Sequence, residues 1–216
     1  MTMDPDTDTL IASLVDDLRP ARVLRRRYGL GLTAAAAAAT LAVVAIVFGF
    51  RSDISAGRFD TLFLIANGLF LILGVACAAT VIAMGNPQVG SRHFGWRWVA
   101  AAACLLPLSA IIILASGTEA LPGIIMSVHE MDCLFAGVTL GLLTAAVLVF
   151  WLRRGAPTSP ERAGLLVGVA SGCIGIFAFA FHCSTDTIYH VGLWHSAPVL
   201  ISALLGRLLV PRLVRW

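Results

Sequence analysis

Charged residues are scarce in this sequence, and lysine is absent. Asp, Glu, Lys and Arg make up only 12% of the 216 residues and 59% are apolar, whereas an ordinary soluble domain is about 25% charged and about 45–50% apolar. These proportions exclude a soluble globular domain, a disordered chain and a basic protein that coats nucleic acid. No two cysteines have the Cys-x-x-Cys spacing that is common in structural zinc sites. The composition instead indicates a multi-pass membrane protein.

Six apolar runs are long enough to cross a membrane, which takes roughly 20 residues for a hydrocarbon core about 30 Å thick. The runs are Tyr28–Phe50, Thr61–Met84, Trp98–Ser116, Met131–Leu152, Ala163–His182 and Ile188–Val210. Because the linkers between them are short, we expect one compact all-α bundle of six transmembrane helices over residues 28–216. Residues 1–27 are left as a cytoplasmic segment, which begins acidic and does not resemble a cleavable signal peptide.

The arginines give this bundle an orientation. Only two of the fifteen, Arg51 and Arg58, fall in loops on one side, and the other thirteen fall on the opposite side. Cytoplasmic loops carry an excess of positive charge. We therefore expect both chain termini in the cytoplasm and the loop that contains Arg51 and Arg58 on the outer side of the membrane.

Small residues predict where two helices approach most closely. Gly137 and Gly141 lie four residues apart in the fourth run, and more glycines follow at helical spacing in the fifth. These are Gly164, Gly168, Gly172 and Gly175. Small residues at this spacing let helix backbones come together in a bilayer, so the fourth and fifth runs should form a tight antiparallel hairpin. The alternative is that glycine is simply common in membrane helices.

Two cysteines belong to this hairpin. Cys133 extends the Gly137/Gly141 face, and Cys183 falls near the glycine ridge of the fifth run. At 1.5 Å per residue, both lie roughly 30 Å from the inner boundary, so we expect them at the outer surface, at nearly equal height and on facing helices. A glycine-lined crossing could bring their Cα atoms within the roughly 4.4–6.8 Å that a disulfide needs. The remaining cysteines should act as small hydrophobic residues; they are Cys77, Cys104 and Cys173.

Polar residues gather around Cys133 and Cys183 on the outer side. They are His129, Glu130, Asp132, His182, Asp186, His190 and His195. An acidic surface with thiols and imidazoles suits soft or borderline divalent cations, and thiolate–imidazole pairs make a cysteine easy to oxidise. We therefore predict a sensor at the two cysteines that binds a divalent heavy-metal ion transiently, with no constitutive cofactor. The alternative is that these side chains only cap helix ends.

The segment before the first run has the pattern of an amphipathic helix. Asp16 and Asp17 would lie in its last turn, where the helix dipole disfavours negative charge, and this points to a basic partner. We predict that the segment docks in a groove of a partner protein. The contact residues would be Leu10, Ile11, Leu14, Val15, Asp17, Leu18, Arg19 and Pro20. Packing of this helix against the bundle is the alternative.

Several short motifs also occur together in a recognisable order. They are Leu10–Pro20, Arg153–Pro157, His182–Cys183 with Asp186, Trp194–His195 and Arg215–Trp216. Together they resemble the NrsF family of negative regulators of sigma F, which are six-span bacterial anti-sigma factors. The resemblance implies a protein that sequesters an extracytoplasmic-function sigma factor at the inner membrane and releases it under envelope stress. It further implies that Cys133 and Cys183 face the periplasm and respond to heavy metals or oxidants, and that Leu10–Pro20 contacts the sigma factor.

We accordingly expect a regulator and not an enzyme, with a sigma factor and the lipid bilayer as partners, no direct contact with nucleic acid and no small-molecule substrate. A membrane thiol oxidoreductase is one alternative, but it needs a second, exchanging cysteine pair. A haem protein with two axial histidines is another. A metal transporter is disfavoured because the runs carry no ladder of carboxylates across the membrane.

Overall fold

A computed structural model describes residues 5–17, 24–86 and 128–214, together with positions 101, 104, 107, 108, 111 and 115. Within these residues the chain is helical and contains no strand. The helices are α1 (Pro5–Asp16), α2 (Arg26–Val43), η1 (Val44–Phe48), α3 (Ser52–Ser55), α4 (Thr61–Met84), α8 (Val128–Arg153), α9 (Pro160–Phe179), α10 (Ile188–His190), η2 (Val191–His195) and α11 (Ser196–Leu213).

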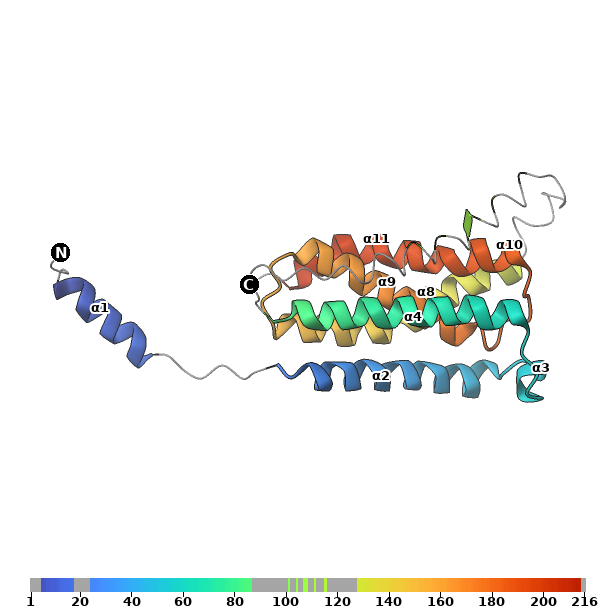
Figure 1. Cartoon of the computed structure of the whole chain (residues 1–216), viewed down its shortest axis with the longest axis horizontal. Helices are drawn as coiled ribbons and strands as arrows, with labels where there is room; N and C mark the ends of the chain where they lie inside the picture. The colour runs from blue at the N-terminus through green and yellow to red at the C-terminus, as the bar shows by residue number, and fades with distance from the viewer. Residues whose placement is uncertain are drawn as a thin grey trace.

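Five helical stretches in the described part of the chain are long and apolar enough to cross a membrane. They lie at five of the six runs that the sequence predicts, and Thr61–Met84 has the predicted bounds. The remaining run, Trp98–Ser116, lies almost entirely outside the described residues, so the prediction of six spans stays a prediction. Figure 1 shows the long helices side by side in one bundle.

Local sequence explains the loop that joins the first two long helices. Gly49 has a φ of +78°, a left-handed conformation that glycine adopts without steric cost, and the helix formed by α2 and η1 ends there. The next long helix begins at Asp60, whose carboxylate caps it by accepting a hydrogen bond from the Leu62 backbone N–H at 2.9 Å. Between these two points the chain forms the short helix α3, which lies at one end of the bundle (Figure 1).

Helix α9 is the centre of the bundle and is the most deeply buried of the long helices. A Cβ atom at Gly175 would overlap the carbonyl oxygen of Gly137, and one at Gly141 would lie 2.5 Å from the carbonyl oxygen of Ser171. The predicted close hairpin of α8 and α9 is therefore confirmed. It depends on backbones in direct contact, which is how membrane helices associate.

The prediction was incomplete for the other glycines of α9. A Cβ atom at Gly164 would overlap the Gly206 carbonyl oxygen, and one at Gly168 would overlap that of Ser202. Gly172 likewise lies against Val199. The glycine ridge therefore serves two neighbours, because α9 lies between α8 and α11 and presents small residues to both.

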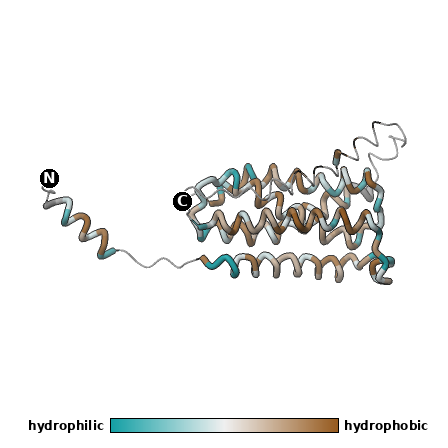
Figure 2. The backbone as a smooth tube through the Cα atoms, in the orientation of Figure 1, coloured by the Kyte–Doolittle hydropathy of each residue, from teal (hydrophilic) through white to brown (hydrophobic). Residues whose placement is uncertain are grey.

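The outside of the bundle is apolar. Large hydrophobic side chains are exposed along the long helices, among them Ile46, Ile72, Leu142, Leu200 and Leu204. Figure 2 shows hydrophobic residues along the length of these helices. An apolar exterior around a packed interior is compatible with a multi-pass membrane protein.

Helix α1 lies apart from the bundle in Figure 1. Its stripe of Leu10, Ile11, Leu14 and Val15 is 46–61% exposed, so this apolar face does not pack against the described part of the bundle. The other predicted contact residues Leu18, Arg19 and Pro20 lie outside the described residues, and Asp17 directly follows the helix.

Candidate functional site

The two cysteines singled out by the sequence meet two histidines at one end of the bundle. Cys133 lies in the first turns of α8, and Cys183 lies in the loop after α9. His190 ends α10 and His195 ends η2. We call these four residues the Cys–His cluster. All four are at most 3% exposed, so the two cysteines, which were predicted at the outer end of their helices, are enclosed by protein at that end of the bundle.

The atoms of the Cys–His cluster are in mutual contact. The two sulfurs are 3.6 Å apart, much longer than a disulfide bond of about 2.05 Å. His190 Nε2 lies 3.5 Å from Cys133 Sγ and 3.4 Å from Cys183 Sγ. One atom from each of the four residues, His195 included, falls within 4.8 Å of the other three. The predicted facing of Cys133 and Cys183 is therefore confirmed.

A wide helical turn brings His190 and His195 to the same side of their helix, where the two cysteines lie. Residues five apart in an α-helix point in different directions, because each residue advances the chain by about 100°. Val191–His195 instead forms a π-helical turn, in which hydrogen bonds join residues five apart. The rings of His190 and His195 consequently touch, with centroids 5.2 Å apart and planes at 73°.

The structure separates the other predicted neighbours from the Cys–His cluster. His182 Nδ1 lies 3.0 Å from the Gly49 carbonyl oxygen, Asp186 pairs with Arg51, and Asp132 is exposed. The side chains of His129 and Glu130 lie outside the described residues. Of the seven polar residues that the sequence places around the cysteines, His190 and His195 are the two that the described structure brings to them.

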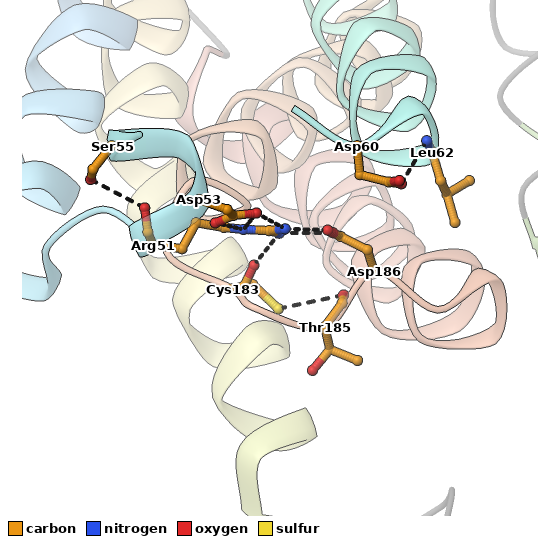
Figure 3. Close-up of polar contacts among 8 residues, drawn as sticks. All are labelled: Arg51, Asp53, Ser55, Asp60, Leu62, Cys183, Thr185 and Asp186. Atoms are coloured by element: carbon orange, nitrogen blue, oxygen red, sulfur yellow. Dashed lines mark hydrogen bonds and ion pairs between the residues drawn. The ribbon is translucent and has the colours of Figure 1, made fainter. Parts of the chain in front are cut away.

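Arg51 lies beside the cysteines although the sequence did not predict it as a site residue. Its Nη1 donates to the Cys183 carbonyl oxygen at 2.8 Å and to Asp186 Oδ1 at 2.9 Å, and its Nε donates to Asp53 Oδ1 at 2.8 Å. Figure 3 shows the guanidinium between the two carboxylates and beside the Cys183 loop. The available signal was composition: Arg51 is one of two arginines on a side of the molecule that is rich in acids.

This network shifts the pKa values of its members. The hydrogen bonds to Asp186 and Asp53 raise the pKa of Arg51 above its usual value. The hydrogen bond from Arg51 lowers the pKa of Asp53 to about 2. Arg51 and Asp53 are therefore both charged throughout the physiological range, and Arg51 also connects the α3 loop to the Cys183 loop through its contacts with Asp186 and the Cys183 carbonyl oxygen.

The environment also favours the thiolate form of Cys183. The Cys133 thiol donates a hydrogen bond to its sulfur, and together with His190 and His195 it lowers the pKa of Cys183, although burial acts in the opposite direction. A thiolate is the form of cysteine that binds metals and attacks oxidants. The Cys–His cluster can therefore bind a soft or borderline cation, or join its two sulfurs in a disulfide.

Known proteins resemble this chain over most of its length. A family model described as negative regulator of sigma F, NrsF, matches residues 14–216. The chain belongs to the NrsF family. The match begins within α1 and includes Arg51 and the whole Cys–His cluster.

Two curated relatives are similar along nearly their entire length. The probable anti-sigma-F factor NrsF of Azospira oryzae is 28% identical over 203 residues, which cover 88% of this chain and 89% of the relative. The anti-sigma-F factor NrsF of Caulobacter vibrioides is 28% identical over 221 residues, which cover 97% and 99%. No solved structure matches. Members of the NrsF family are thus named as regulators and not as catalysts.

Proposed function

We propose that this chain is an anti-sigma factor of the bacterial inner membrane. It holds an extracytoplasmic-function sigma factor at the cytoplasmic face and releases it when Cys133 and Cys183 meet a heavy-metal ion or an oxidant on the periplasmic side. The observation that carries the proposal is the NrsF family match over residues 14–216, which includes both the cysteine pair and part of α1.

The orientation is supported by the arginines. In the predicted six-span topology, thirteen of the fifteen arginines fall on the side of the two chain termini and Arg51 and Arg58 fall on the other, so the positive-inside rule favours α1 in the cytoplasm. The Cys–His cluster lies at the same end of the bundle as Arg51. It is therefore on the periplasmic side, where envelope stress is met first.

Helix α1 is the element that we assign to sigma-factor binding. Its exposed apolar stripe has no partner within the described part of the chain, and no basic residue lies in its last turn to offset Asp16. An amphipathic helix of this kind binds in a hydrophobic groove through side chains at i, i+3, i+4 and i+7 spacing. A groove with basic residues at its edge would complement Asp16 and Asp17.

The cysteine pair can respond in two ways. A heavy-metal ion can bind both sulfurs, which are already in contact, with release of the Cys133 thiol proton. Alternatively, the Cys183 thiolate can attack a peroxide, breaking its O–O bond to give a sulfenic acid and hydroxide, and the Cys133 thiol then displaces the sulfenic oxygen as water and forms the disulfide. Disulfide formation shortens the distance between the two sulfurs from 3.6 Å to about 2.05 Å, and a metal ion instead fixes α8 and the Cys183 loop relative to each other at nearly their present spacing.

A continuous path connects this change to α1. The Cys183 carbonyl oxygen accepts from Arg51 Nη1, and the Arg51 backbone N–H donates to the Phe181 carbonyl oxygen at 3.0 Å. Arg51 closely follows the helix formed by α2 and η1, and the other end of that helix leads back to α1. In this proposal, movement of the Cys183 loop is passed along the helix formed by α2 and η1 toward the segment that carries α1. Shifting the bound fraction from 99% to 1% takes about 5.5 kcal/mol, within reach of metal–thiolate bonds.

A haem protein is less consistent with this site. The contacting rings of His190 and His195 leave no space for a porphyrin between them, and axial histidines bind on opposite faces of a haem.

The experiment that tests the proposed function is affinity purification from membranes solubilised in mild detergent, followed by mass spectrometry. The wild type is compared with Leu14→Asp, which puts a charge on the apolar stripe of α1. Thr9→Asp is the matched control, because position 9 lies on the opposite face of the same helix. We expect a sigma factor with the wild type and with Thr9→Asp, and none with Leu14→Asp. Absence of a sigma factor from the wild-type sample would overturn the proposal.

A further inference from the structure

We propose that Cys133, Cys183, His190 and His195 together form a single four-coordinate site for a borderline divalent ion of the zinc group, Zn²⁺ or Cd²⁺. The inference rests on the proposed function for the role of the cysteines as the sensor. It adds two ligands from a different element, the coordination number and the class of ion.

The distances in the Cys–His cluster fit the edges of a zinc tetrahedron. With Zn–S bonds of about 2.3 Å and Zn–N bonds of about 2.0–2.1 Å, two sulfurs should lie about 3.8 Å apart and a sulfur and a nitrogen about 3.6 Å apart. The sulfurs are 3.6 Å apart, and His190 Nε2 lies 3.5 and 3.4 Å from them. Three of the four corners are therefore already spaced for one ion, and His195 is close enough to supply the fourth.

The environment of His195 is a second, independent observation that supports a metal site. The residue is only 3% exposed, and within the described residues its Nε2 has no hydrogen-bond partner. A buried ring nitrogen without a partner costs free energy. A metal–nitrogen bond in the Cys–His cluster would remove that cost.

The donor atoms decide which ions fit. Two thiolates and two neutral imidazoles form the Cys₂His₂ donor set that Zn²⁺ prefers, and the two thiolate charges neutralise the ion, as a buried site requires. Hard ions such as Mg²⁺ and Ca²⁺ need oxygen ligands. The nearby carboxylates of Asp53 and Asp186 are both engaged by Arg51, which leaves the Cys–His cluster with sulfur and nitrogen donors.

The positions of the four ligands suggest what the ion does to the fold. They come from three parts of the chain: α8, the loop after α9, and the α10–η2 turn that leads into α11. An ion would hold these three parts at fixed distances, with the Cys183 loop between them. Because Arg51 binds that loop, the metal site and the path to α1 share one segment.

The test is a metal titration of the purified, reduced full-length protein in detergent. Co²⁺ serves as the spectroscopic probe for four-coordinate thiolate ligation, and Zn²⁺ then displaces it in competition with a chromophoric chelator. The variants are Cys183→Ser, His190→Gln and His195→Gln. His182→Gln is the matched control, since this histidine adjoins Cys183 in sequence but bonds to the Gly49 carbonyl. Circular dichroism checks that each variant keeps its helices, and His195→Cys restores a fourth ligand if His195→Gln is misfolded.

We expect one ion per chain, with the visible absorption and the thiolate charge-transfer band of tetrahedral Co²⁺. His190→Gln and His195→Gln should each weaken Zn²⁺ binding by at least the roughly 10–100-fold that even a second-shell change costs, and His182→Gln and added Mg²⁺ should have no effect. No binding by the wild type, or unchanged spectra and affinity in both histidine variants, would overturn the four-ligand site. The titration contains no sigma factor, so its failure and the failure of the co-purification are separate results.

Discussion

At the scale of single residues, the proposed function depends on two sulfurs that are in contact without being bonded. Cys133 and Cys183 are 50 positions apart in the sequence, and their Sγ atoms are 3.6 Å apart. Their approach is set by the surrounding helices, so a smaller polar atom at either position should leave the fold in place. Metal binding and disulfide formation, in contrast, require the cysteine sulfurs.

The first prediction follows from this difference. Replacing both cysteines by serine should abolish induction by heavy metals and oxidants while basal repression persists, measured with a reporter gene under sigma-factor control. Cys104→Ser is the control, because Cys104 is exposed and lies outside the Cys–His cluster. Full reporter activity in unstressed cells carrying the double variant would contradict a sensor role and indicate a structural one.

The second prediction concerns pH and Asp53. Its pKa is lowered from 3.8 to about 2 by Arg51, so its contribution to stability is present above about pH 4 and is lost as the pH falls through 2. Thermal unfolding in detergent should therefore show a constant difference between the wild type and Asp53→Asn from pH 7 down to about pH 4. The difference should vanish near pH 2. If the difference in unfolding temperature already disappears between about pH 7 and about pH 5, the stabilising ion pair between Arg51 and Asp53 is refuted.

At the residue scale, the sequence predicted correctly those features that depend only on the number of positions along a helix. The equal depth of Cys133 and Cys183 follows from helical rise and needs no tertiary information. It failed for Arg51, because the partners Asp186 and Cys183 lie more than 130 positions away. It also could not select His190 and His195 over His182, since that choice depends on the π-helical turn at Val191–His195.

At the scale of helices, backbone contact at glycine determines the packing of α9. The third prediction compares two changes of the same size. Gly168→Ala places a methyl group on the Ser202 carbonyl of α11 and should cost about 1–3 kcal/mol, as over-packing does. Gly68→Ala in α4 meets nothing within 4 Å and should be neutral or stabilise the helix by about 0.5–1 kcal/mol.

Thermal unfolding of the two variants in detergent distinguishes them. Equal unfolding temperatures for Gly168→Ala and Gly68→Ala would mean that α9 and α11 are not in backbone contact. The sequence predicted a glycine ridge but assigned it to a single neighbour, because spacing along one helix does not show how many helices surround it.

The fourth prediction concerns the tie between the Cys183 loop and α2. Arg51→Gln removes the ionic contacts to Asp53 and Asp186 and leaves the Cys–His cluster itself unchanged. We expect the variant to bind Zn²⁺ with wild-type affinity, while metal no longer raises reporter activity above the basal level. Arg58→Gln, a change at an exposed arginine in the same loop, should respond normally. Normal induction by metal in Arg51→Gln would show that the signal reaches α1 by another route.

At the scale of the whole molecule, the sequence predicted most of the architecture because a bilayer permits few solutions. Each apolar run of sufficient length must become a helix, and the five runs within the described residues do so with bounds close to those predicted. The arrangement of these helices around α9 could not be obtained in this way. Glycine spacing predicted that α8 and α9 pack together, but it did not show that α11 packs on the other side of α9, because this long-range contact is not specified by spacing along one helix.

The proposed mechanism couples a binding helix, α1, to a metal or redox site, the Cys–His cluster, at the opposite end of one bundle. Its central claim is that chemistry at the Cys–His cluster releases the protein held by α1. Neither end suffices alone: α1 without the cluster would be a constant repressor, and the cluster without α1 would have no output.

The most direct test is release from the purified complex. The wild-type protein, immobilised in lipid nanodiscs with its sigma factor bound, is exposed to Cd²⁺ or peroxide, and the sigma factor in the eluate is quantified. The double variant Cys133→Ser, Cys183→Ser, prepared in the same way, is the control. We predict release of most of the sigma factor from the wild type and retention by the variant. Retention by both, or equal release from both, would contradict the account.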